Sequence, residues 1–216
     1  MTIKLLETKD GIYQGNVNSE NPDIPNGYGE LQFKNGDFYS GNFRNGVFQG
    51  KGRIVLKNME KYDGVWHKGR KHGKGTYHYA NGDRYTGGWM NGIRFGVGKY
   101  FYESGDNLYD GEWCDDTRTG DGVFLFNSGD VYKGHFRANK FHGEGLFVYG
   151  KESEWKGDKY TGNWLNSKRH GIGKYIFRDG NVYKGSWVEG VREGFSVFKW
   201  VDGALFVFFL LFFFFS

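Results

Sequence analysis

Glycine pairs are the first residues whose spacing could do chemistry. Gly73-Lys74-Gly75, Gly96-Val97-Gly98 and Gly171-Ile172-Gly173 resemble part of a phosphate-binding loop. The third glycine of Gly-x-Gly-x-x-Gly is absent in all three, no helical pattern follows, and Gly-Lys-Ser/Thr does not occur. The glycine pairs therefore predict no nucleotide site.

Histidine, cysteine and acidic residues could bind a metal or carry protons. His72, His142 and His170 each precede the same glycine of a recurring pattern, which indicates a structural position rather than a site. Cys114 has no histidine near it in sequence, and Asp115-Asp116 has too few ligands for a calcium loop. We expect no catalytic residue, cofactor, metal or small-molecule substrate.

The chain repeats, and the repeat must position whatever functional surface exists. Tyrosines recur at steps of 23, 23, 24, 23, 28 and 23 residues, and a glycine follows each two residues later: Tyr39, Tyr62, Tyr85, Tyr109, Tyr132, Tyr160 and Tyr183. A constant period of this length indicates a repeat protein.

Each repeat reads as two strands. Tyr85, Gly87 and Trp89 alternate with the more polar Thr86 and Gly88, which predicts a strand with one aromatic face. A second strand with alternating apolar residues is expected after each Gly-x-Gly, and Asn-Gly or Asp-Gly turns reverse the chain between repeats. The glycine between the two aromatic residues leaves a gap that we expect a ring from a neighbouring hairpin to cover.

The expected fold is all-β: an elongated, twisted, single-layer array of antiparallel β-hairpins with about eight units. We expect a half-repeat cap over residues 1–12, the array over 13–203 and an apolar tail over 204–216. Insertions near 18–25 and 151–158 lengthen two units, and the second adds a tryptophan. Such loops are candidates for specificity.

The phenylalanine-rich tail has three interpretations. Ala204 to Phe215 is apolar but shorter than the ~20 residues of a membrane-spanning helix. It is a membrane-inserting tail, a terminal strand, or the translation of a T-rich stretch from a truncated or misjoined reading frame, and we favour the last.

The charge is mildly basic, at +4, which is too weak to indicate nucleic-acid binding. Basic residues gather in what we take as the hairpin loops of two repeats: Lys68, Arg70, Lys71, Lys168 and Arg169. They are either ordinary solvated charges, which we favour, or an edge that binds anionic phospholipid. The lone Cys114, the absence of Asn-x-Ser/Thr and the lack of a signal peptide argue against secretion and favour the cytoplasm.

The aromatic face is the main functional candidate. It is core where rings cover one another, which we favour, and a partner site where it stays open. Its candidate residues are Tyr62, Trp66, Tyr85, Trp89, Tyr109, Trp113, Tyr160 and Trp164.

The pattern Tyr-x-Gly-x-Trp-x-x-Gly-x-x-x-Gly-x-Gly, as in Tyr62 to Gly75, resembles the MORN (membrane occupation and recognition nexus) repeat over nearly the whole chain. Val17, Asn16, Ser196 and Asp116 depart from it. The resemblance implies a non-catalytic scaffold that binds a protein partner or itself, at a membrane, the cytoskeleton or a cilium. Alternatives are a peripheral module for anionic phospholipid, or a regulatory fragment of a lipid kinase or lysine methyltransferase.

Overall fold

The computed structural model describes residues 3–103 and 107–210, which fall into two compact units, residues 1–103 and 104–216. In the first unit the strands are β1 (Ile3–Glu7), β2 (Gly11–Val17), β3 (Pro25–Phe33), β4 (Phe38–Arg44), β5 (Val47–Val55), β6 (Lys61–His67), β7 (Arg70–His78), β8 (Arg84–Met90) and β9 (Ile93–Phe101). In the second they are β10 (Leu108–Cys114), β11 (Thr117–Leu125), β12 (Val131–Arg137), β13 (Lys140–Val148), β14 (Lys159–Leu165), β15 (Lys168–Ile176), β16 (Val182–Val188), β17 (Val191–Lys199) and β18 (Leu205–Leu210).

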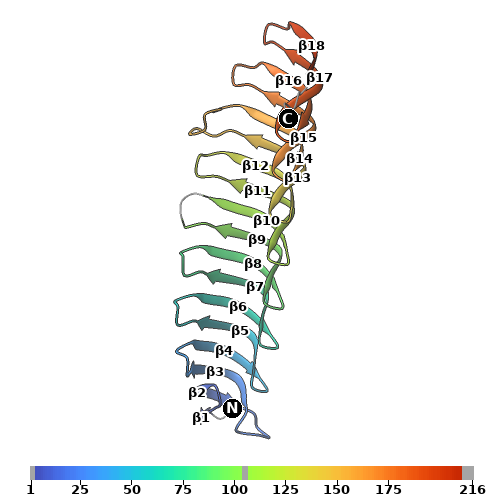
Figure 1. The fold of residues 1–216 in the computed structure, drawn as a ribbon. Helices are drawn as coiled ribbons and strands as arrows, with labels where there is room; N and C mark the ends of the chain where they lie inside the picture. The colour runs from blue at the N-terminus through green and yellow to red at the C-terminus, as the bar shows by residue number, and fades with distance from the viewer. Residues whose placement is uncertain (1–2, 104–106, 211–216) are drawn as a thin grey trace, which may run out of the picture. The chain divides into compact units, whose positions relative to one another are not determined.

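Within each unit every strand pairs antiparallel with the next strand in sequence, so the hairpins follow one another in a single sheet (Figure 1). The β8–β9 pair is representative: Tyr85 faces Tyr100, Gly87 faces Gly98 and Trp89 faces Arg94. The described residues contain no helix. The predicted all-β array of antiparallel hairpins is confirmed.

The second strand of each hairpin begins earlier than the sequence pattern suggested. β9 starts at Ile93 and includes Gly96 and Gly98, because the chain turns at Asn91-Gly92, where both residues have positive φ. Such two-residue turns match the twist of antiparallel strands. Between Gly87 and Trp89 the register shifts, and Gly96, with φ of 74°, lies in the resulting bulge. The Gly-x-Gly pair is thus a bulge within a strand.

Tyrosine forms the centre of every hairpin. The tyrosines at this position are fully buried, and each hydroxyl donates a hydrogen bond to the backbone carbonyl three residues later: Tyr13, Tyr39, Tyr62, Tyr85, Tyr109, Tyr132, Tyr160 and Tyr183. Burial raises the pKa of Tyr160 to about 12, so its phenol remains a donor at neutral pH.

The tyrosine ring also explains the paired glycines. A Cβ added to Gly87 or to its cross-strand partner Gly98 would collide with the phenol of Tyr85. The expectation that a neighbouring hairpin supplies this ring is therefore wrong, because the ring belongs to the same strand. In the last repeat Ser196 replaces the second glycine, and its hydroxyl lies 2.7 Å from that of Tyr183.

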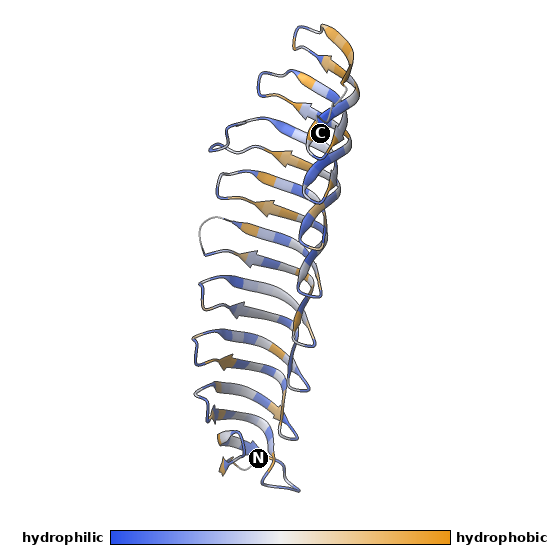
Figure 2. Ribbon diagram, viewed as in Figure 1, coloured by the Kyte–Doolittle hydropathy of each residue, from blue (hydrophilic) through white to orange (hydrophobic). Residues whose placement is uncertain are grey.

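The ends and insertions keep strand or turn structure where they are described. β1 pairs antiparallel with β2. Leu205–Leu210 of the tail form β18, which pairs with β17 as in the terminal-strand interpretation, and Figure 2 shows this strand as strongly hydrophobic. Residues 211–216 of the tail lie outside the described residues. Among those that are described, no helix is long and apolar enough to cross a membrane.

Candidate binding groove

One cross-strand pair distinguishes the repeats from each other. Where the first strand carries tryptophan, its partner on the second strand is a cation: Trp66 with Lys71, Trp89 with Arg94, Trp113 with Arg118, Trp164 with Arg169 and Trp187 with Arg192. Where the first strand carries phenylalanine, the partner is also phenylalanine: Phe43 with Phe48 and Phe136 with Phe141. The residue nine positions after the tyrosine thus sets the chemistry of this face.

These cations lie on the aromatic rings instead of extending away from the strands. The Lys71 Nζ atom is 4.1 Å from the ring centre of Trp89, and the Arg169 guanidinium is 4.3 Å from that of Trp187. Arg192 lies 4.7 Å from the Tyr183 ring. Cation–π contacts of this kind contribute about 0.5–2 kcal/mol each. The aromatic face is therefore also a row of positive charges.

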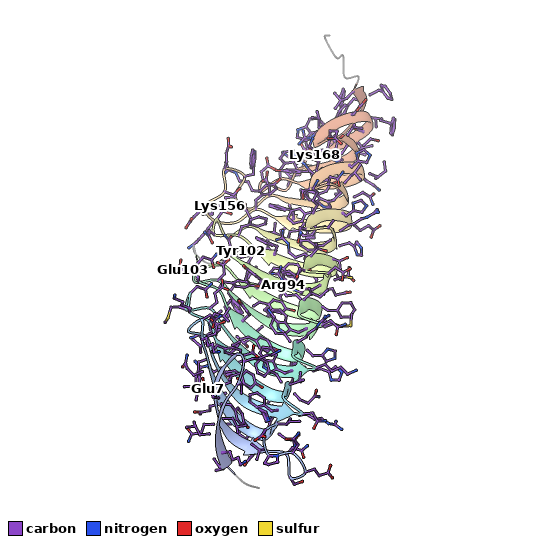
Figure 3. All side chains as sticks on the ribbon, turned by 60° about the horizontal axis from the view of Figure 1, so that its bottom comes forward. Glu7, Arg94, Tyr102, Glu103, Lys156 and Lys168 are labelled. Atoms are coloured by element: carbon purple, nitrogen blue, oxygen red, sulfur yellow. The ribbon has the colours of Figure 1, made fainter. Side chains whose placement is uncertain are left out.

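A cation-lined hollow on this face lies in the second unit. A groove of about 550 Å³ runs over β15 to β17 and beside the inserted loop, and it is lined by Tyr149, Trp155, Asp158, Arg169, Tyr175, Phe177, Trp187, Gly190, Val191 and Arg192. Trp155 comes from the insertion near 151–158 and keeps 53% of its surface exposed, while its ring contacts that of Tyr149. Lys156, labelled in Figure 3, lies on the same loop. A smaller groove of about 300 Å³ surrounds Lys71 in the first unit.

A buried carboxylate fixes the floor of the groove. Asp158 is 6% exposed and accepts hydrogen bonds from the Tyr175 hydroxyl at 2.6 Å and from the Arg178 backbone N–H at 2.7 Å. Burial, followed by the bond to Asp158, raises the pKa of Tyr175. The Tyr175 phenol is therefore held as a donor, and Asp158 ties one repeat to the next.

This hydrogen bond between consecutive repeats was not predicted from the sequence. An acidic or amide side chain stands two residues before each of the buried hairpin tyrosines except Tyr13 and accepts a hydrogen bond from the backbone N–H twenty residues later: Asp37, Glu60, Asp83, Asn107, Asp130, Asp158 and Asn181. The signal was visible in the Asn-Gly-Asp turns, but it was interpreted only as turn chemistry. Arg192 and Tyr175 of the groove were also not singled out.

The candidate aromatic residues lie in the core. Tyr62, Tyr85, Tyr109 and Tyr160 are fully buried, and the paired tryptophans are at most 7% exposed: Trp66, Trp89, Trp113 and Trp164. Burial of this extent favours the packing role. A partner on this face would meet the partly exposed cations that lie over the rings.

The candidate lipid-edge residues divide into two groups. Lys68, Arg70 and Lys168 are exposed at the turns, and Lys168 is paired with Glu189. Lys71 and Arg169 are partly buried on strands, over aromatic rings. Figure 3 labels Lys168 and, in the first unit, Arg94, which holds the same repeat position as Lys71 and Arg169.

No metal site forms from the residues considered in the sequence. Across residues 3–103 and 107–210 no group of three or more His, Cys, Asp or Glu side chains could hold a metal ion. His72 and His170 each keep a buried Nδ1 atom without a hydrogen bond, and Cys114 is partly buried and reduced.

The sequence profile of the MORN repeat matches eight times, at residues 23–38, 39–58, 62–84, 85–107, 109–131, 132–154, 160–182 and 183–205. The chain belongs to the MORN repeat family. Each match contains the turn, bulge and tyrosine arrangement described above or part of it, and this MORN array is a repeat scaffold.

No protein with a curated description matches the chain. Solved structures that are similar at low identity include two domains in complex with a segment of another protein. The SAS-4 (dCPAP) TCP domain of Drosophila melanogaster, in complex with a proline-rich motif of Ana2 (dSTIL), has 10% identity and a TM-score of 0.39, and the match covers 95% of this chain and 88% of that one. The TCP10 domain of Danio rerio CPAP, in complex with a peptide of STIL, has 8% identity and a TM-score of 0.43, with 95% and 97% covered.

Proposed function

We propose that this MORN array is a non-catalytic scaffold that binds an extended segment of a partner protein in the groove over β15 to β17. The observation that carries the proposal is the groove itself, in which Trp155 and two arginines are available beside a buried, hydrogen-bonded floor. Exposed tryptophan and arginine are the side chains most enriched where protein interfaces gain their affinity. A hollow of about 550 Å³ accommodates a few residues of extended chain and not a folded domain.

The proposal is tested with a random peptide library displayed on phage and selected on the immobilised chain. Selected peptides should bind the wild type at least about tenfold tighter than Trp155→Ala, a loss of about 1.4 kcal/mol. Ile172→Ala is the matched control, because it removes an apolar side chain that is 58% exposed on β15 and does not line the groove. A selection that yields no peptide dependent on Trp155 refutes the proposal.

Lipid binding is a second candidate, supported by the exposed basic residues Lys68 and Arg70 at one turn of the first unit. Each basic residue near an anionic surface contributes about 1 kcal/mol. Sedimentation with phosphatidylserine vesicles should then fall in Lys68→Glu/Arg70→Glu, whereas binding that is absent at low salt contradicts it. A cytoplasmic location at a membrane, the cytoskeleton or a cilium rests on the MORN resemblance, and a fluorescent fusion would test it.

A further inference from the structure

Arg169 and Arg192 form a two-step ladder in the groove. They hold the same position in consecutive hairpins, each as the cross-strand partner of a tryptophan. None of the ion pairs within the described residues involves either guanidinium. Burial lowers the pKa of Arg192, and the neighbouring Arg169 lowers it further although Tyr183 raises it, while no ion pair among the described residues gives Arg192 an anionic partner. A bound anion would supply that partner.

The carboxylate that lines the groove is not paired with either arginine. The oxygens of Asp158 accept hydrogen bonds from Tyr175 and from the Arg178 backbone, and no ion pair among the described residues joins Asp158 to Arg169 or Arg192. Arg169 donates only to the Gly190 carbonyl, at 3.3 Å. The two arginines are therefore the electrostatic feature of the groove that remains available to a ligand.

The spacing of the ladder selects the shape of that ligand. Strands in a sheet lie about 4.8 Å apart, so equivalent side chains of consecutive hairpins are about 9.6 Å apart. A polyproline II helix has three residues per turn and rises about 3.1 Å per residue, or about 9.3 Å per turn. Every third side chain of such a segment points to the same side and advances by nearly one hairpin.

We propose that the groove binds a polyproline II segment with acidic side chains three residues apart, one carboxylate on Arg169 and the next on Arg192. This inference rests on the proposed function and specifies its ligand. Polyproline II segments dock on aromatic surfaces, and here Trp155, Phe177 and Trp187 line the groove beside the arginines.

Because the ladder has only two arginines, it also limits how many acidic side chains of the ligand can be paired. In the preceding hairpin the equivalent position is Phe141, stacked on Tyr132 with ring centres 3.7 Å apart. At that step the ligand meets a ring instead of a cation. The matching segment therefore has two acidic residues at positions i and i+3, with an apolar residue three positions beyond one of them.

Fluorescence anisotropy with labelled synthetic peptides tests the inference on the full chain. The probe is a twelve-residue repeat of Glu-Pro-Pro, and its composition-matched control places the four glutamates together between proline runs. A Lys-Pro-Pro repeat controls for charge. The Glu-Pro-Pro probe should bind about tenfold tighter than either control. Equal affinity for the grouped-glutamate or the lysine peptide overturns the inference.

Variants locate the site. Arg169→Met and Arg192→Met should each weaken Glu-Pro-Pro binding about tenfold, whereas Lys168→Met, which removes an exposed charge next to Arg169, should change it less than about twofold. If the Arg192→Met variant folds poorly, Arg192→Lys replaces it. This variant keeps the positive charge, and its binding should remain closer to wild type. Glu-Pro-Pro binding that is unaffected by both methionine variants refutes the assignment.

The phage selection separates this inference from the proposed function. Peptides that depend on Trp155 but lack acidic residues three apart leave the function standing and overturn the inference. A selection without such peptides overturns both. Anionic vesicles that bind through Arg169 and Arg192, with no peptide binding, also overturn both and assign the groove to lipid.

Discussion

A methyl group at Gly98 should destabilise the first unit strongly. A Cβ there would lie 2.5 Å from the Cζ atom and 2.6 Å from the Cε2 atom of Tyr85, which is fully buried. The phenol would have to move and would lose its 2.9 Å hydrogen bond to the Gly88 carbonyl. Overpacking costs about 1–3 kcal/mol and the hydrogen bond about 0.5–1.5, so we expect Gly98→Ala to lower the free energy of unfolding by about 2–4 kcal/mol.

Gly98→Ser separates the two contributions. Serine is larger than alanine, so steric crowding alone predicts an equal or greater loss. The last repeat shows the alternative, because Ser196 is fully buried and its hydroxyl pairs with that of Tyr183. We therefore expect Gly98→Ser to recover about 1 kcal/mol relative to Gly98→Ala. Urea unfolding followed by tryptophan fluorescence measures both, with Thr86→Val on the exposed face as a control that should cost well under 1 kcal/mol. A serine variant less stable than the alanine variant refutes this account of the tyrosine.

Three further outcomes follow from the same contacts. The Tyr77 hydroxyl, 2.6 Å from Oε2, lowers the pKa of Glu60, so its contribution to stability is present above its ordinary pKa of 4.5 and is lost as the pH falls through the lower folded value. Glu60→Gln should lower the melting temperature at neutral pH, and thermal scans should show the deficit shrinking below pH 4.5; a constant deficit contradicts this. Ala138 has a φ of 48°, a conformation that asparagine tolerates better, so Ala138→Asn should raise the urea midpoint by about 0.5–1 kcal/mol of stability, and Ala138→Val should lower it. Phe136→Trp and Phe141→Arg should each destabilise, while the double variant should lose about 0.5–1 kcal/mol less than their sum in a double-mutant cycle; strict additivity would show that the pair is not coupled.

The sequence predicted the fold because its signals are local. A tyrosine two residues before a glycine and a tryptophan two residues after it lie on the same face of a strand. Asn-Gly turns reverse the direction of the chain between strands. The bulge was less visible. A regular continuation of the turn at Asn91-Gly92 would place Gly96 opposite Gly87, and only the bulge moves Gly98 into that position. Without the bulge, the reason for keeping two glycines could not be assigned to the correct ring.

The sequence predicted which types of residue form the candidate site, but it did not predict how they are arranged. The aromatic residues were identified, but periodicity alone does not say which of them stay buried and which cations cover them. Lys71 and Arg169 were grouped with turn residues because the second strand was expected to begin after the glycines. Recognising the two-residue turn would have paired Trp164 with Arg169 directly, since the register near a tight turn is fixed by its length. The contribution of Trp155 depends on how the insertion folds, which no pattern specifies.

Two pairings at one position explain why the charged surface is interrupted. A tryptophan on the first strand can reach the preceding repeat, as Trp164 does by donating to the Gly145 carbonyl at 3.2 Å, although the buried Nε1 atom of Trp187 has no hydrogen bond. Phenylalanine has no N–H to donate, and in those repeats a second phenylalanine stacks flat on the tyrosine, as Phe141 does at 3.7 Å with an angle of 8°. The cations paired with tryptophan lie over rings that include those of the following repeat, as Lys71 does over Trp89 and Arg169 over Trp187. The scaffold can thus divide one repeating surface into charged and apolar stretches by exchanging a single cross-strand pair, and the groove lies where two charged repeats follow an apolar one.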